Sequence, residues 1–318
     1  MRGHFGVVTL IVAVALSVSA PSSAMNATAV SSFDAADVAF GSLRSYQTVS
    51  IPGLGTMSAV GSPELPVRVL RFVIPPDASV EEVVVGHVFE EELPGTYRIA
   101  PRQPEVPIGE TSEWVVPDAT VYESDGLYPS ERVSYLGDGY LGGYRIASVA
   151  VHPLQYEPAT GRLLAATDVS VELVLGRGAD RSARRARVTR RSDELYRSLV
   201  EGLVENPEDV ASCRGAVEVV GELGVEGYSP RYTPSLDGSP VEYLIVTSDE
   251  LEPYFQPLAD WKTQKGVPAA IRTVSWIEAN YPGGCDTAER IRLFLKDAYA
   301  SWGTTYVLLG GDTQIVPV

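Results

Sequence analysis

The spacing of apolar residues predicts a β-rich region from about residue 30 to residue 178. Residues 67–74 and 80–88 are β-branched runs, and Pro75-Pro76-Asp77 between them is a turn signal. Residues 144–152 and 163–175 are interpreted as paired strands joined through residues 157–161. Short strands at this spacing favour a β-sandwich.

A proline-dense segment, residues 94–129, separates these runs. Proline removes a backbone donor, so the segment predicts extended chain with few ladder hydrogen bonds. Residues 114–116, Trp-Val-Val, are a candidate edge strand within it.

Residues 137–142, Gly-Asp-Gly-Tyr-Leu-Gly, match the dinucleotide-binding pattern by letter. That pattern must follow a strand and open a helix. Here it leads into the strand-like run that starts at Tyr144, so we interpret it as a glycine-rich hairpin.

A different pattern begins at Val241 and predicts an α/β domain. The runs alternate in the order strand 243–247, a helix up to Gly266, strand 267–274, helix 286–301 and strand 305–309. This βαβαβ order, at about 30 residues per unit, predicts a parallel sheet with right-handed crossovers. Three strands with so few helices cannot bury both faces of a parallel sheet, so we expect the domain to be incomplete and the chain to be a fragment.

Local signals mark the helices of this domain. Pro257 lies inside the first, which predicts a kink or a helix that restarts there. Leu251, Phe255, Leu258 and Trp261 share one face of it. Asp286 and Glu289 have capping-box spacing before the second helix, and Gly303 ends it.

The connector between the two regions starts with six arginines in residues 181–191, a composition typical of a solvated run. Ser192 then caps a predicted amphipathic helix, residues 192–205, with Leu195, Leu199, Val200 and Leu203 on one face. Asn206-Pro207 ends it. Residues 221–240 are rich in glycine and proline and predict a linker. This layout is typical of a secreted zymogen.

The N-terminus has the features of an export signal. A positive start, Met1-Arg2, is followed by an apolar core, and small residues precede a cleavage site after Ala24. A membrane anchor is the alternative, but the segment is short for a span. No later segment is apolar and long enough to cross a bilayer.

Composition narrows the classes of partner. The formal net charge of −16 argues against nucleic acid, which needs clustered Lys and Arg. Two cysteines, Cys213 and Cys285, supply neither a disulfide framework nor a zinc motif.

The histidines restrict catalysis more than any motif does. They are His4, His87 and His152, and none follows Arg191, so the α/β residues cannot form a Cys–His or Ser–His–Asp centre. Cys285 precedes a helix N-terminus, where the helix dipole favours a thiolate, but we interpret it, like Cys213, as incidental. We therefore assign no catalytic residue.

Two aspartates follow predicted strands of the α/β domain. Asp312 lies at the carboxyl end of a buried strand, the edge where ligands of open α/β sheets gather. Its carboxylate can bind a metal, position a substrate or cap the loop. Asp249 has a similar place after the first strand, and helix capping is its simpler role.

Five segments, together with Pro317, carry a family resemblance: residues 61–66, 151–158, 243–249, 258–266 and 306–312. They resemble segments of the gingipain-type cysteine endopeptidases, peptidase family C25. The β region is similar to the C25 propeptide, and the α/β region to the opening of the peptidase domain.

The resemblance implies a caspase-like α/β catalytic domain whose histidine and cysteine both follow residue 318. It also implies that Asp312 helps to bind a structural calcium, with the other ligands downstream. Arg231-Tyr232 looks like the junction where the prodomain is cut from the mature enzyme, and the arginine run ending at Arg191 is an alternative cleavage region. Family members include sortase-like enzymes of a secretion system.

The sequence thus predicts a multidomain chain: a signal peptide (1–24), a β-sandwich propeptide (25–180), a basic and flexible linker (181–240) and a truncated caspase-like α/β domain (241–318). The leading hypothesis is the N-terminal fragment of a secreted or cell-surface cysteine endopeptidase zymogen that acts on proteins or peptides. Its prodomain would inhibit the catalytic domain and assist its folding. The alternatives are a non-catalytic binding or adhesion module and a sortase-like relative.

Overall fold

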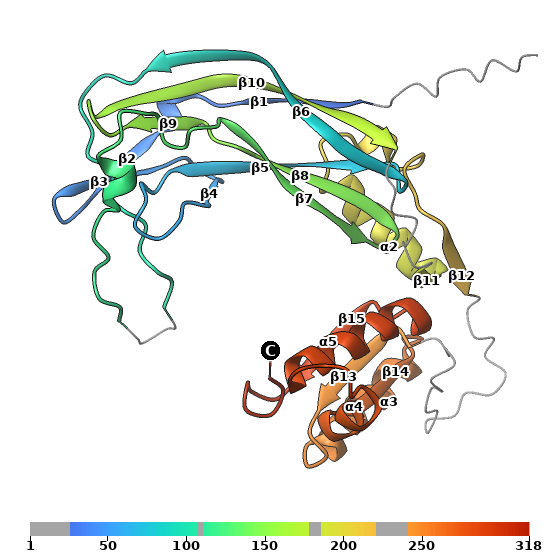
Figure 1. Cartoon of the computed structure of the whole chain (residues 1–318). Helices are drawn as coiled ribbons and strands as arrows, with labels where there is room; N and C mark the ends of the chain where they lie inside the picture. Colours follow the sequence, from blue (N-terminus) through green and yellow to red (C-terminus); the bar gives the residue numbers. More distant parts are fainter. Residues whose placement is uncertain (1–25, 107–110, 178–185, 221–240, 318) are drawn as a thin grey trace, which may run out of the picture.

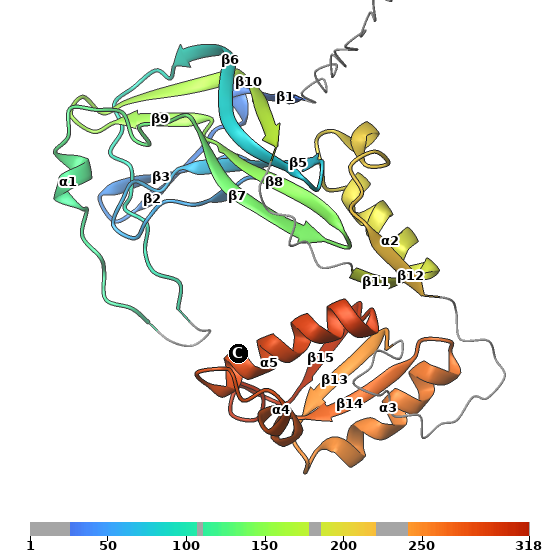
Figure 2. The ribbon, with the colours of Figure 1, turned by 45° about the vertical axis from the view of Figure 1, so that its right-hand side comes forward.

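The computed structural model describes residues 26–106, 111–177, 186–220 and 241–317 (Figure 1). Strands predominate, and they form several separate sheets. The β-rich part lies on one side and an α/β part on the other, with the helix α2 between them (Figures 1 and 2). Among the helices of the described residues, none is long and apolar enough to cross a membrane.

Two four-stranded antiparallel sheets face each other in the β-rich part. The first contains β1 (Ala27–Ser32), β10 (Arg162–Arg177), β6 (Ala78–Glu92) and β9 (Leu154–Glu157). The second has the order β4 (Gly55–Thr56), β5 (Pro66–Ile74), β8 (Tyr144–Val151) and β7 (Val133–Leu141). A separate hairpin joins β2 (Ala39–Leu43) to β3 (Tyr46–Ser50). The short helices are η1 (Ala35–Asp37) and α1 (Ala119–Tyr122).

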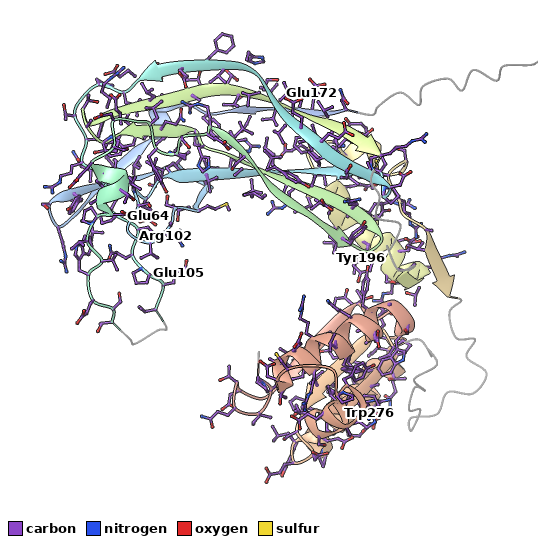
Figure 3. All side chains as sticks on the ribbon, viewed as in Figure 1. Glu64, Arg102, Glu105, Glu172, Tyr196 and Trp276 are labelled. Carbon is purple, nitrogen blue, oxygen red and sulfur yellow. The ribbon has the colours of Figure 1, made fainter. Side chains whose placement is uncertain are left out.

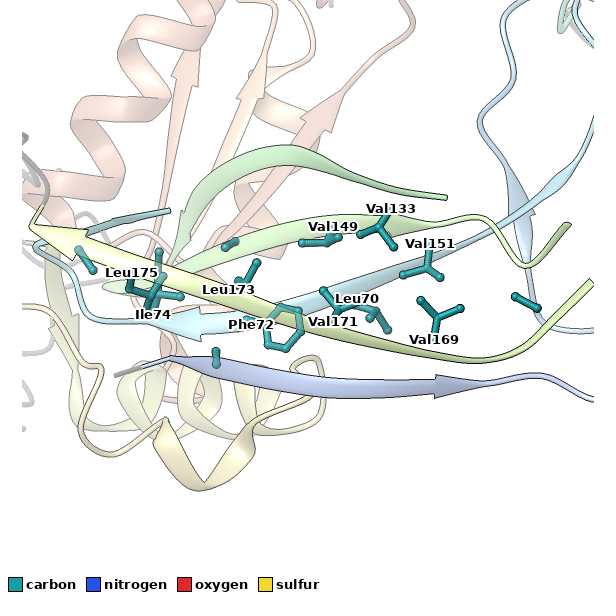
Figure 4. Packing of buried hydrophobic residues seen from close by; sticks show 14 residues of the cluster. Leu70, Phe72, Ile74, Val133, Val149, Val151, Val169, Val171, Leu173 and Leu175 are labelled. Carbon is teal, nitrogen blue, oxygen red and sulfur yellow. The ribbon is translucent and has the colours of Figure 1, made fainter. Parts of the chain in front are cut away.

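Alternate residues of the two sheets fill the space between them. Leu70, Phe72 and Ile74 of β5 are fully buried and pack with residues of β8 and β10 (Figure 4). Val169, Val171 and Leu173 show the same period of two on β10. Because side chains of a strand alternate between its faces, this pattern builds the sandwich core that the sequence predicts.

The expected pairing of residues 144–152 with 163–175 is wrong. β8 and β10 belong to opposite sheets, and the turn at residues 157–161 joins β10 to the short strand β9 instead. The chain leaves the second sheet at His152-Pro153, where the proline has no amide to continue the ladder. Gly161, at φ 75°, closes the turn.

Of two other expectations for the β-rich part, one is wrong and one is confirmed. Residues 114–116 form no strand, because the side-chain amide of Gln103 bonds both the N–H (2.9 Å) and the C=O (3.0 Å) of Val115. The glycine-rich hairpin is confirmed, since β7 and β8 pair through the turn Gly142-Gly143.

The connector helix α2 (Arg190–Glu201) starts two residues earlier than predicted. Thr189 is its N-cap, and Ser192 is the reciprocal partner in a capping box. The expected apolar face is right only in part: Val200 is buried, whereas Leu199 and Leu203 are 49% and 39% exposed. The buried line is Ser192, Tyr196 and Val200, at i, i+4 spacing.

Flanking elements fix α2 to the β-rich part. Parallel strands β11 (Ala186–Thr189) and β12 (Val217–Val220) precede and follow it, with the 3-10 helix η2 (Pro207–Asp209) between. The side chain of Asn206, just before η2, accepts from the N–H of Val73 and donates to its C=O, both at 3.0 Å. Asn206 thus continues the ladder at a free position of β5.

The α/β part has the parallel sheet that the sequence predicts. The strand order is β14 (Ala269–Thr273), β13 (Tyr243–Thr247), β15 (Tyr306–Gly310). The helices are α3 (Glu252–Gln264), α4 (Val274–Asn280), α5 (Thr287–Asp297) and the π-helix η3 (Ala298–Trp302). One face of the sheet packs with α3, and the other with α4, α5 and η3 (Figure 2).

Some of the helix predictions for the α/β part are confirmed, and others are wrong. α3 runs through Pro257 as one helix, so the predicted restart is wrong. The predicted apolar face is right for Phe255 and Leu258, which pack on the sheet, but not for Trp261, which is 51% exposed. Asp286 caps α5 by accepting from the N–H of Glu289 at 2.7 Å, and Gly303 ends η3 in the left-handed region at φ 69°. The helix α4 was not predicted.

Candidate functional site: two edges of the α/β sheet

The carboxyl ends of the three parallel strands meet at one edge of the α/β sheet. The hydroxyl of Thr247, at the end of β13, donates to the carbonyl of Gly310, at the end of β15, at 2.6 Å. Asp249 and Asp312 follow these two neighbouring strands. The structure therefore brings both predicted aspartates to the edge where open α/β sheets bind ligands.

Asp249 connects two elements at this edge. Its carboxylate accepts from the hydroxyl of Ser275 in α4, with distances of 2.8 and 2.6 Å to the two oxygens. This bond, with a second from Thr273, holds the pKa of Asp249 below its ordinary value. The expected role as helix cap is wrong, because the hydroxyl of Ser248 instead accepts from the N–H of Leu251, the N-cap of α3.

Asp312 closes the loop after β15. Its Oδ1 accepts from the amides of Gln314 (2.9 Å) and Ile315 (3.2 Å), and the residue is exposed. Within the described residues, no group of three or more His, Cys, Asp or Glu side chains could hold a metal ion. Calcium binding by Asp312 therefore stays a prediction, and capping the loop is the role that its contacts support.

Cys285 also lies at this edge, beside the start of α5. It is exposed, and its backbone N–H donates to Oε2 of Glu289 at 2.8 Å. A hydrogen bond of the thiol with Glu289, and the negative charges of Asp286 and Glu289, raise the pKa of Cys285. These carboxylates oppose the helix dipole, so the thiol is not activated.

We expect Glu289→Gln to increase the rate at which Cys285 reacts with a maleimide at pH 7.5 by a few-fold. The substitution removes a negative charge that disfavours the thiolate, and the thiolate is the reactive form. Stopped-flow labelling across pH 6–9 measures the rate, and Glu250→Gln on the same part is the control. A rate that Glu289→Gln leaves unchanged would contradict this account of the pKa.

The opposite, amino-end edge of the same sheet contacts the β-rich part. Tyr299 of η3 packs against an apolar cluster that includes Tyr144, Val188 and Tyr196. Burial raises the pKa of Tyr299, and hydrogen bonds with the backbone of Gly142 and Gly143 partly offset that rise. The hairpin turn between β7 and β8 thus receives a tyrosine from the α/β part.

Helix α2 also takes part in this contact. Tyr196 lies at the junction of the two parts (Figure 3) and is hydrogen-bonded to the side chain of Thr305, just before β15. Glu242, just before β13, is only 5% exposed. Burial raises the pKa of Glu242, and the nearby positive charge of Arg191 opposes the rise.

The predicted processing residues have different outcomes. Ala24, Arg231 and Tyr232 lie outside the described residues. Arg191 lies in the first turn of α2 rather than in an extended segment, so cleavage beside it would require that turn to unwind. Sequence reasoning missed Tyr196 and Tyr299, although the adjacent glycines at 142 and 143 were a signal that another group approaches this turn.

Comparison with family models decides the classification. A model of the C25 propeptide matches residues 18–193, more than half of the chain, and a model of peptidase family C25 matches residues 237–318. The chain belongs to the gingipain-type C25 precursors. The β-rich part is therefore its C25 propeptide region, and the α/β part is the start of a C25 peptidase region.

Curated relatives agree with this family. Lys-gingipain of Porphyromonas gingivalis is 25% identical over 283 residues, covering 85% of this chain and 15% of the relative. Gingipain R2 of the same species is 24% identical over 264 residues, covering 82% of this chain and 32% of the relative. The chain therefore spans between about a seventh and a third of the length of these relatives.

A solved complex of the pro- and mature domains of RgpB from Porphyromonas gingivalis is also similar. Its sequence identity is 20% and its TM-score is 0.43, with 49% of this chain and 81% of the other chain covered.

Proposed function

We propose that this chain is the N-terminal part of a secreted or cell-surface cysteine endopeptidase zymogen. The observation that supports the proposal is a C25 propeptide region followed, in one chain, by the start of a C25 peptidase region that contacts it. The domain limits are those predicted from the sequence: signal peptide, propeptide, linker and a truncated peptidase domain with a caspase-like fold.

In the complete protein, a cysteine thiolate activated by histidine would attack the carbonyl of a peptide bond in a protein or peptide substrate. Both groups would come from chain after residue 318. The propeptide would inhibit the catalytic domain and assist its folding until cleavage at Arg231-Tyr232 separates the two. Asp312 would supply one ligand of a structural calcium, whose other ligands would also follow residue 318.

We expect the 318-residue chain to show no peptidase activity, because Cys285 has a raised pKa and the histidines His87 and His152 lie in the β-rich part. Assays with fluorogenic peptides that carry Arg, Lys or other residues before the cleaved bond test this. Turnover that Cys285→Ala abolishes would sink the proposal that the catalytic dyad lies downstream.

The coding sequence after the codon for Val318 tests the proposal most directly. Further βα units with a histidine and a cysteine at strand ends would support a protease zymogen. Their absence would support a binding or adhesion module. A complete protein that has the dyad but transfers peptides instead of hydrolysing them would be the sortase-like relative.

A further inference from the structure

Among the described residues, hydrogen bonds and charges link the propeptide region to the amino-end edge of the peptidase sheet. Glu242 immediately precedes β13, Thr305 immediately precedes β15, and Tyr299 belongs to η3, which leads into β15. Each of these three residues faces α2 or the hairpin turn at Gly142.

The opposite, carboxyl edge of the sheet carries the side chains of the candidate site. Asp249 and Asp312 follow the carboxyl ends of β13 and β15, and Cys285 precedes α5, which starts at that same edge. In Figures 1 and 2 the C-terminus and the start of α5 lie at one end of the α/β part, and α2 and β11 lie beside the other end.

We propose that the propeptide region holds the peptidase region by its amino-end edge, through Tyr299 seated on the turn Gly142-Gly143 and on α2. This contact is a tether, separate from the carboxyl edge where substrate would bind. The inference rests on the proposed zymogen function and adds the surface by which the two regions stay together.

The turn that Tyr299 contacts is packed closely against α2 and β12. Gly142 and Gly143 have φ of 58° and 91°. A Cβ on Gly142 would lie 2.2 Å from Cγ of Tyr196, and a Cβ on Gly143 would lie 2.6 Å from Val217. The carbonyl of Gly143 accepts from the amide of Gly215 at 2.9 Å. These contacts place the turn between Tyr299 on one side and α2 and β12 on the other.

Helix α2 belongs to the propeptide side of this contact. Asn206 bonds the backbone of Val73, and the amide of Glu205 donates to the carbonyl of Arg71 at 2.8 Å. A cut between residues 221 and 240 would therefore leave α2 on the sandwich, with Tyr196 and Arg191 still facing Thr305 and Glu242. The tether does not depend on the covalent linker.

The test uses the whole 318-residue chain with a recognition site for a sequence-specific protease inserted between residues 221 and 240. After the cut, the dissociation constant of the two pieces is measured by analytical ultracentrifugation over a dilution series. We expect the pieces of the parent to remain associated and Tyr299→Ala to raise the dissociation constant at least ten-fold. The control Tyr254→Ala, whose side chain is 79% exposed on α3, should leave it unchanged.

A milder variant keeps the test decisive if Tyr299→Ala folds poorly. Tyr299→Phe keeps the ring and removes only the hydroxyl that bonds the backbone of Gly142 and Gly143. We expect the dissociation constant to rise by at least about three-fold, because one or both of these hydrogen bonds are lost. Pieces that separate in the parent, or an unchanged dissociation constant in folded Tyr299→Ala, would overturn the proposal.

Thiol labelling tests which edge is covered. Cys285 is exposed at the carboxyl edge and Cys213 is buried. We expect Cys285 to react with a maleimide at the same rate in the associated pieces as in the dissociated pieces of Tyr299→Ala. Slower labelling in the associated state would mean that the contact extends to the carboxyl edge. Neither measurement needs peptidase activity, so the tether can fail while the zymogen proposal stands, and the reverse.

Discussion

Phe72→Ala is expected to lower the free energy of unfolding of the β-rich part by about 4 kcal/mol. Phe72 is fully buried on β5, between the two sheets of the sandwich (Figure 4). Removing a buried phenyl ring loses its transfer free energy and leaves a cavity that a closely packed core fills only in part. Because side chains from β5, β8 and β10 meet there, the cavity affects both sheets.

Urea denaturation followed by far-ultraviolet circular dichroism measures this loss. Phe89→Ala is the matched control, because Phe89 lies on β6 and its side chain is 60% exposed. That control should cost less than about 0.5 kcal/mol. Equal losses for the two phenylalanines would show that the sheets do not face each other as described.

Asn206→Ala is expected to lower the free energy of unfolding by about 3 kcal/mol. The Asn206 side chain is 3% exposed and bonds both backbone groups of Val73, in β5. Its amide also donates to Asp209 at 2.8 Å. Alanine leaves a buried N–H and a buried C=O without partners, and each such group costs about 1–3 kcal/mol.

The same denaturation experiment measures the effect, and amide hydrogen exchange at Val73 locates it. Glu208→Ala, an exposed position in the adjacent η2, is the control and should change stability little. Protection of the Val73 amide that survives in Asn206→Ala would contradict the assigned bond. Loss of Asn206 should also weaken the association of the two cut pieces, because it loosens α2.

The elements of the α/β part were easier to predict from the sequence than those of the β-rich part. β13 and β15 are continuous apolar runs, although β15 is largely exposed in the structure. The helix signals at Asp286 and Gly303 mark the start of α5 and the end of η3. The helix α4 escaped prediction because Thr273, which caps it, is also the last residue of β14, so strand and helix have no turn between them.

Other predictions failed where contacts with residues distant in the sequence determined the local structure. The sequence placed Val200 on one face with Leu195, Leu199 and Leu203. The structure buries Val200 with Tyr196 instead, because Val73 and Tyr144 pack there. Val115 lacks a strand because Gln103, twelve residues away, satisfies its backbone.

Part of the candidate site could also be predicted from the sequence, and part could not. The position of Asp249 and Asp312 at strand ends follows from sequence, because the carboxyl ends of parallel strands share one edge. The partner of Asp249, Ser275, lies 26 residues away and required the folded chain.

By itself, the sequence determined three things: the division into a β-rich part and an α/β part, the parallel direction of the strands in the α/β sheet, and the family resemblance. These depend on periodicity, turns and caps, which are interactions among residues close in the chain. Only the tertiary structure decided which sheet holds β8, which face of α2 is buried and that Tyr299 meets the turn at Gly142. Those contacts join residues more than a hundred positions apart, or elements whose faces are equally apolar, so no local pattern encodes them.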